Sequence, residues 1–226
     1  MFGEIVEPCT RALIDEDEFD EFTEHAVGVP DWEGNAEPPD DIDYLIFIET
    51  ERVKAFVQNC VLKEPAPVSK INNAGIEICI VDENKYFVIF SGKKNFTCNE
   101  ITQLLEKWIK TAKYVCAITS ESIYNYQNDN LQEKPTSLVK MLTSNNKNKA
   151  LDYGILECPN LVTGLGASIL TYCLLAGVKC NLYVIYVDTA PLDSLNMKSL
   201  LMLFSDLGIS LKNTNISLTP ASNLYM

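Results

Sequence analysis

Side chains that commonly carry out catalysis are sparse in this sequence. The single histidine, His25, lies in an acidic stretch near the start of the chain. It therefore cannot easily complete a Ser-His or Cys-His pair, and the rest of the chain offers no histidine as a metal ligand. We expect no catalytic residues, no metal site and no cofactor.

Two glycines come nearest to a nucleotide-binding motif. Gly164-Leu165-Gly166 resembles the start of a dinucleotide fingerprint near a predicted helix start, but Ile169 stands where the third glycine belongs. Close packing of the helix explains both glycines at least as well as phosphate binding does. The spacing therefore gives only weak support to a nucleotide site.

Acidic residues of the central region do not form a suggestive catalytic pair. Each lies at a predicted strand end, where turns and helix caps commonly use acids; they are Asp152, Glu157, Asp188 and Asp193. Such residues can still converge in a folded chain. An α/β hydrolase- or phosphorylase-like enzyme of unknown substrate is therefore the alternative hypothesis.

Binding chemistry is concentrated in the tail formed by residues 213–226. This tail is polar until it ends in Leu224, Tyr225 and Met226. Such an ending is useful only if it packs into a pocket, either on the protein's own body or on a partner. In a partner's pocket the terminal carboxylate would meet a cation and main-chain donors. Tyrosine suits this role because its ring buries a large area while its hydroxyl still finds a hydrogen bond.

The charge pattern separates an acidic arm from a folded body. The formal net charge is −13, yet residues 1–43 contain fifteen acidic residues and only one basic residue, Arg11. The rest of the chain is nearly neutral and gives no electrostatic reason to expect nucleic acid or an anionic membrane as a partner. Residues 1–13 form a short apolar segment, and 14–43 predict a disordered arm. The aromatic residues Phe19, Phe22 and Trp32 could instead be docking residues within an otherwise disordered arm.

Eight cysteines do not predict a disulfide framework here. The chain starts without the basic and apolar pattern of a signal peptide, and most cysteines lie in apolar segments. We expect reduced core thiols and a cytoplasmic protein, with a nuclear location left open. Glycines and polar residues interrupt the most apolar stretch, 161–187, so we expect no membrane span.

Apolar periodicity in residues 44–212 predicts a single layered α/β/α domain with a mostly parallel central sheet. Expected strands cover 44–48, 76–81, 86–90, 114–118 and 181–187, the second and third forming a hairpin. Expected helices cover Asn99 to Ile109 with Asn99 as the cap, Ser137 to Leu142, Leu161 to Ala176 before Gly177, and Ser194 to Leu207 before Gly208.

Three patches, in order along the chain, resemble the proteasome assembly chaperone 1 family. The first is the start, 2–6 with Pro8 and Cys9; the second is 156–162, continuing through Leu165 to Cys173; the third is 222–225. Together they cover about a fifth of the chain. The middle resembles the family only in its pattern of strands and helices.

The resemblance implies a protein without catalysis or cofactor that pairs with proteasome assembly chaperone 2. The heterodimer would sit on the 20S proteasome α ring, promote its assembly and discourage α-ring dimers. Leu224 would then fill the apolar part of a pocket between α subunits, Tyr225 would pack in its wall, and Met226 would offer its carboxylate to a pocket lysine. A general scaffold with an acidic arm is a third hypothesis, without dependence on these residues.

Overall fold

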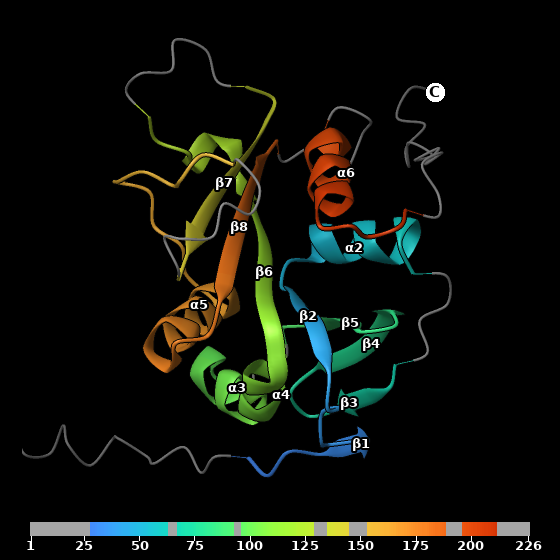
Figure 1. Cartoon of the computed structure of the whole chain (residues 1–226). Helices are drawn as coiled ribbons and strands as arrows, with labels where there is room; N and C mark the ends of the chain where they lie inside the picture. Colours follow the sequence, from blue (N-terminus) through green and yellow to red (C-terminus); the bar gives the residue numbers. More distant parts are fainter. Residues whose placement is uncertain are drawn as a thin grey trace, which may run out of the picture.

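The computed structural model describes residues 28–62, 67–92, 96–128, 135–144, 153–188 and 196–211. They form an eight-stranded mixed sheet with helices on both faces, which confirms the predicted α/β/α class (Figure 1). The strands are β1 (Trp32–Gly34), β2 (Ile42–Ile48), β3 (Ser69–Ile71), β4 (Ile76–Asp82), β5 (Lys85–Phe90), β6 (Ala112–Ser122), β7 (Ser137–Thr143) and β8 (Cys180–Val187). The helices are α2 (Glu51–Cys60), α3 (Cys98–Leu104), α4 (Glu106–Thr111), α5 (Leu165–Ala176) and α6 (Asn196–Asp206), with a 3-10 turn at Ile123–Asn125.

The predicted parallel arrangement occurs at the centre of the sheet. Strand order is β1-β3-β4-β5-β2-β6-β8-β7, and the pairs β5-β2, β2-β6 and β6-β8 are parallel. The remaining pairs are antiparallel, including the predicted hairpin β4-β5. Continuous apolar runs in β2 and β8 suit this central position because both faces of those strands are covered.

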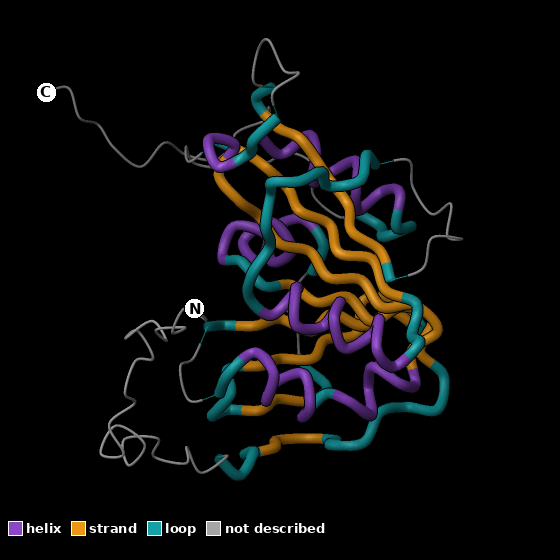
Figure 2. The backbone as a smooth tube through the Cα atoms, turned by 90° about the vertical axis from the view of Figure 1, so that its left-hand side faces the viewer, coloured by secondary structure: helices purple, strands orange, loops and turns teal. Residues whose placement is uncertain are grey.

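Two hydrophobic cores lie on opposite faces of the sheet. One packs α3, α4 and α5 around Trp108 and Ile169, and the other packs α2 and α6 around Phe56 and Phe204. Figure 2 shows helices on both sides of the strands. Four cysteines predicted as core thiols, Cys79, Cys116, Cys173 and Cys180, are buried.

The two ends of α5 follow from glycine. Gly177 takes a left-handed φ of 71° and ends the helix, as predicted. The start differs from the predicted Leu161, because Gly164 has a φ of 91°, which lies outside the helical region. Among the described residues, no helix is long and apolar enough to cross a membrane.

The predicted helix at Ser137 to Leu142 is wrong. These residues form β7, antiparallel to β8, with Val139 opposite Ile185 and Met141 opposite Tyr183. Both Val139 and Met141 are buried on the face that α6 covers. Alternating burial of every second residue is the strand pattern, and pairing with β8 outweighs the local helical preference of Leu, Lys and Met.

The helix predicted from Asn99 is present but divided. It forms α3 and α4, separated at Leu105, and its cap is Thr97 rather than Asn99. The Thr97 side chain accepts from the Glu100 N–H, while a Glu100 carboxylate oxygen accepts from the Thr97 N–H at 2.6 Å. This capping box satisfies two backbone donors that would otherwise have no partner.

Part of the arm predicted to be disordered belongs to the fold. Residues 28–43 include β1 and the start of β2, and Trp32 packs against the core that contains α3 to α5. The Asn73 side chain accepts from the Asp31 N–H and donates to the Val29 carbonyl, and the Trp108 indole donates to the Ala36 carbonyl. Aromatic docking therefore outweighs charge repulsion here, while 14–27 lie outside the described residues.

Candidate interaction site

The predicted binding residues Leu224, Tyr225 and Met226 lie outside the described residues. The structure does fix where the tail leaves the body. After α6 the chain passes beside β5, where the Lys85 ammonium donates to the Gly208 carbonyl at 2.7 Å. Leu211, the last described residue, packs against the core of α2 and α6.

Glu49 occupies the place where parallel α/β sheets usually bind ligands, beyond the carboxyl ends of the strands. It follows β2, and its two carboxylate oxygens accept hydrogen bonds from the N–H groups of Leu165 and Gly166, at 2.6 and 3.1 Å. These are backbone donors at the start of α5, where a phosphate would bind in a nucleotide site. The protein's own carboxylate therefore caps this helix.

The glycines of the weak fingerprint are explained by this cap. A side chain at Gly164 would place its Cβ 2.1 Å from a Glu49 oxygen, and one at Gly166 would lie 2.9 Å from a Leu182 methyl group. The predicted alternative of close helix packing thus accounts for both glycines.

Glu157 is the one predicted acid that lies within a cluster of polar side chains in the described part of the chain. Its carboxylate accepts hydrogen bonds from the Tyr126 hydroxyl and from Asn128 at 2.7 Å, and it pairs with the Lys140 ammonium at 2.9 Å. Asp152 and Asp193 lie outside the described residues, and the Asp188 carbonyl accepts from Arg52.

The Glu157 cluster holds the loop that follows β7. Burial opposes ionisation of Glu157, but the hydrogen bonds from Tyr126 and Lys140 outweigh it and lower the pKa of the carboxyl to about 2. The same loop is bonded to β7: the Met141 N–H of the strand donates to the Gly154 carbonyl, and the Leu156 N–H of the loop donates to the Met141 carbonyl. The loop therefore covers the outer edge of β7, and the charge cluster has a structural role.

Exposed apolar side chains are the clearest binding feature of the body. Leu161 is 86% exposed, and Leu174 and Leu175 on α5 are 60% and 83% exposed. Helix α5 contains no charged residue, so its outer face has little to favour contact with water. Exposed apolar residues on such a helix are typical of protein-protein contacts.

Comparison with known proteins decides the family. The PAC1 family model, described as proteasome assembly chaperone 4, matches residues 50–221. This chain belongs to the proteasome assembly chaperone family. The match includes the folded body from α2 onward, with the Glu157 cluster and the exposed leucines of α5, and it excludes Glu49 and the three residues Leu224, Tyr225 and Met226.

Curated relatives are similar over part of their length. Proteasome assembly chaperone 1 of Nematostella vectensis is 32% identical over 96 residues, which are 41% of this chain and 37% of that protein. The Xenopus laevis protein of the same name is 26% identical over 114 residues, 50% of this chain and 38% of that protein. The aligned regions thus span well under half of these relatives.

Solved structures agree in fold. Pyrococcus furiosus PbaA, described as an archaeal homolog of proteasome-assembly chaperone, has a TM-score of 0.55 at 14% identity, with 85% of each chain covered. Pyrococcus furiosus PbaB, described as an archaeal proteasome activator, has a TM-score of 0.51 at 10% identity, covering 80% of this chain and 90% of that one.

Proposed function

We propose that the chain promotes assembly of the 20S proteasome α ring as a heterodimer with proteasome assembly chaperone 2. The observation that carries this proposal is the family model's match to residues 50–221, most of the folded body. In this role the protein is a binding partner without catalysis or cofactor, and it works in the cytoplasm.

In the proposed mechanism the tail anchors the chaperone in an α-ring pocket through Leu224, Tyr225 and Met226. Residues 212–226 follow the body, and a fully extended segment of that length reaches about 50 Å. This is long enough to enter a pocket well away from the surface beside β5. The side chains of Leu224 and Tyr225 bury area in the pocket, and the carboxylate of Met226 pairs with a pocket lysine.

The partner chaperone would contact the body rather than the tail. Leu174 and Leu175 are the exposed apolar residues of α5, and burying them against another chain would remove their apolar surface from water. With such a second surface, the pair is expected to survive loss of the tail.

The alternative of an α/β enzyme has less support in the structure. The usual ligand site of this fold class lies at the carboxyl ends of the parallel strands, and there the Glu49 carboxylate binds the N–H groups of α5. A negatively charged substrate at this point would have to displace it.

Removal of Leu224–Met226 tests the tail mechanism. We expect at least about tenfold weaker binding to recombinant α subunits, and unchanged affinity for the partner chaperone, since only the pocket contacts are lost. The matched control carries Ser222→Ala and Asn223→Ala and keeps the last three residues. Equal α-subunit binding by the truncated and full chains would refute tail insertion, and no binding by either would refute the proteasome role itself.

A further inference from the structure

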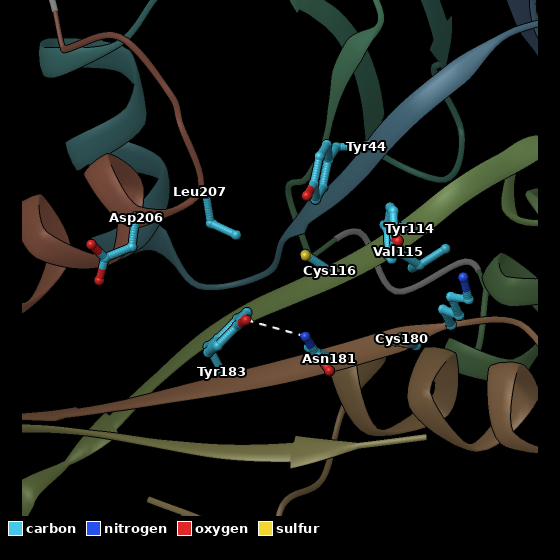
Figure 3. A pocket seen from close by; sticks show the side chains of 10 residues that line it. Tyr44, Tyr114, Val115, Cys116, Cys180, Asn181, Tyr183, Asp206 and Leu207 are labelled. Atoms are coloured by element: carbon cyan, nitrogen blue, oxygen red, sulfur yellow. Dashed lines mark hydrogen bonds between the residues drawn. The ribbon is translucent and has the colours of Figure 1, made fainter. Parts of the chain in front are cut away.

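A cavity of about 190 Å³ lies at the amino-terminal edge of β2, β6 and β8, away from Glu49 and from the Glu157 cluster. It is lined by Tyr44, Tyr114, Val115, Cys116, Lys179, Cys180, Asn181, Tyr183, Asp206 and Leu207. In Figure 3, Tyr44 lies on one side and Tyr183 on the other, with Cys116 between them and Asp206 and Leu207 at one end. Its volume exceeds that of a cavity that binds benzene, about 150 Å³, so it suits one ring or one branched side chain.

Sheet register builds the wall of this cavity. Lys85, Tyr44 and Tyr114 are paired across β5, β2 and β6, and Lys179 directly precedes β8. The two tyrosine rings stack with centroids 5.4 Å apart, and Lys179 lies over the Tyr114 ring at 5.0 Å from its centroid. Lys85 lies over the Tyr44 ring at 5.8 Å. The aromatic wall thus has an ammonium group at each end.

The polar groups of the cavity include several donors, and one buried acceptor, Asn181 Oδ1, has no hydrogen-bond partner among the described residues. Burial raises the pKa of Tyr44 and of Tyr183, so both phenols remain protonated. The Tyr183 hydroxyl accepts from the Asn181 amide at 3.2 Å, which leaves its own proton available. Within the described part of the chain, no hydrogen bond engages the Tyr44 hydroxyl, and no carboxylate lies within ion-pair distance of Lys179.

One carboxylate, that of Asp206, opposes this positive character. The Asp206 carboxylate accepts a hydrogen bond from the Tyr153 hydroxyl at 2.7 Å. Of the two ammonium groups beside the tyrosine wall, that of Lys85 already donates to the Gly208 carbonyl. Lys179 is therefore the charged group of the cavity whose hydrogen-bonding capacity remains for a ligand.

We propose that this cavity binds a small carboxylate carried on an apolar body the size of a single ring. The carboxylate would pair with Lys179, while the apolar body lies against the stacked tyrosine wall. This proposal does not rest on the proposed function.

Benzoate is the probe, and benzamide is its uncharged counterpart of the same shape. Titrated into the full-length protein and followed by NMR chemical shifts, benzoate binds at least about fivefold more tightly than benzamide. Lys179→Gln weakens benzoate about tenfold and leaves benzamide unchanged, whereas Lys198→Gln, which removes an exposed lysine on α6, changes neither.

The proposal is overturned if benzoate binds no better than benzamide, or if Lys179→Gln binds benzoate like the parent protein while the circular dichroism spectra agree. A further measurement identifies the source of the natural carboxylate. If the chain's own end fills the cavity, deleting Leu224–Met226 raises the benzoate affinity; if another molecule supplies the carboxylate, the deletion leaves that affinity unchanged.

Discussion

Glu49 shows how one side chain decides what an edge of the sheet can bind. Its carboxylate accepts from the first N–H groups of α5, which otherwise would have no intrahelical partner. The negative charge also interacts favourably with the positive end of the helix dipole. The same geometry that would hold a phosphate is used here to join β2 to α5.

Replacing Glu49 tests this capping role. Glu49→Ala should lower the free energy of unfolding by about 2 kcal/mol, and Glu49→Gln by about 1 kcal/mol, because Gln keeps an acceptor but loses the charge. Urea unfolding at neutral pH measures both. Glu51→Gln on the exposed first turn of α2 serves as the control and should stay within about 0.5 kcal/mol. An unfolding free energy for Glu49→Ala equal to that of the parent would contradict the cap.

Glu157 should make stability depend on pH in the acidic range. Its pKa is lowered from 4.5 to about 2 in the folded protein, so the unfolded chain binds the proton first as the pH falls. The stabilisation is complete above the unfolded value, decreases below pH 4.5 and disappears near pH 2.

Glu157→Gln isolates this contribution. At neutral pH the variant should be less stable than the parent by about 1–2 kcal/mol, because Lys140 and Tyr126 lose a charged acceptor. In urea unfolding repeated at decreasing pH, the difference between the two proteins should shrink below pH 4.5. A difference that stays constant down to the acid limit of folding would show that the carboxylate charge does not matter.

At the scale of elements, the two ends of α5 offer a matched pair of glycines. Gly164 has a φ of 91° and no room for a Cβ beside Glu49, whereas Gly177 has a φ of 71° and open space around it. Gly164→Ala should therefore cost about 2–4 kcal/mol, and Gly177→Ala only about 1 kcal/mol from its left-handed backbone. Thermal and urea unfolding of the two variants measure the difference, and equal costs would mean that the Glu49 contact is not restrictive.

The outer face of α5 should matter for binding and not for stability. Leu174→Ser together with Leu175→Ser should weaken binding of the partner chaperone about tenfold, because the exposed apolar area is lost from the contact. The free energy of unfolding should change by about 0.5 kcal/mol or less, since both residues are exposed. Met202→Ser, on the half-exposed outer side of α6, is the control for binding; unchanged binding by the α5 variant would exclude this face.

Elements were predictable where their apolar pattern is long and local. The runs in β2 and β8 and the periodicity of α6 identify their types, and Gly177 and Gly208 mark the ends of two helices. The prediction failed at residues 137–142 because their local propensity is helical, whereas their strand conformation depends on pairing with β8, more than thirty residues away. Short edge strands such as β1 also lack a local signal, since Trp32 is ordered by contacts with distant residues.

The candidate sites were predictable only in part. The tail is visible in the sequence because Leu224, Tyr225 and Met226 follow a polar stretch, and their binding role stays a prediction. Glu49 had one available signal, an acid at the end of an apolar run before a helix, but its partner at Leu165 is distant in sequence. The tyrosine wall of the cavity requires the strand register, which a single sequence does not supply.

At the scale of the whole molecule, the sequence places an acidic stretch before the α/β body and an apolar-ended stretch after it. The body carries the family match and exposes apolar residues on α5. The last described residues pass beside β5, at the core that α2 and α6 form on the other face of the sheet. This division is compatible with the function that we propose, in which the body binds the partner chaperone and the tail binds the α ring.

Assembly of the α ring from separate subunits tests this account most directly. Purified α subunits would be mixed with the full-length chain and its partner chaperone, and the products followed by native mass spectrometry. We predict that complete α rings carrying one chaperone pair form faster than without the pair, and that fewer ring dimers appear. Identical ring formation with and without the pair, and no chaperone bound to any α-subunit species, would contradict the proposed role in α-ring assembly.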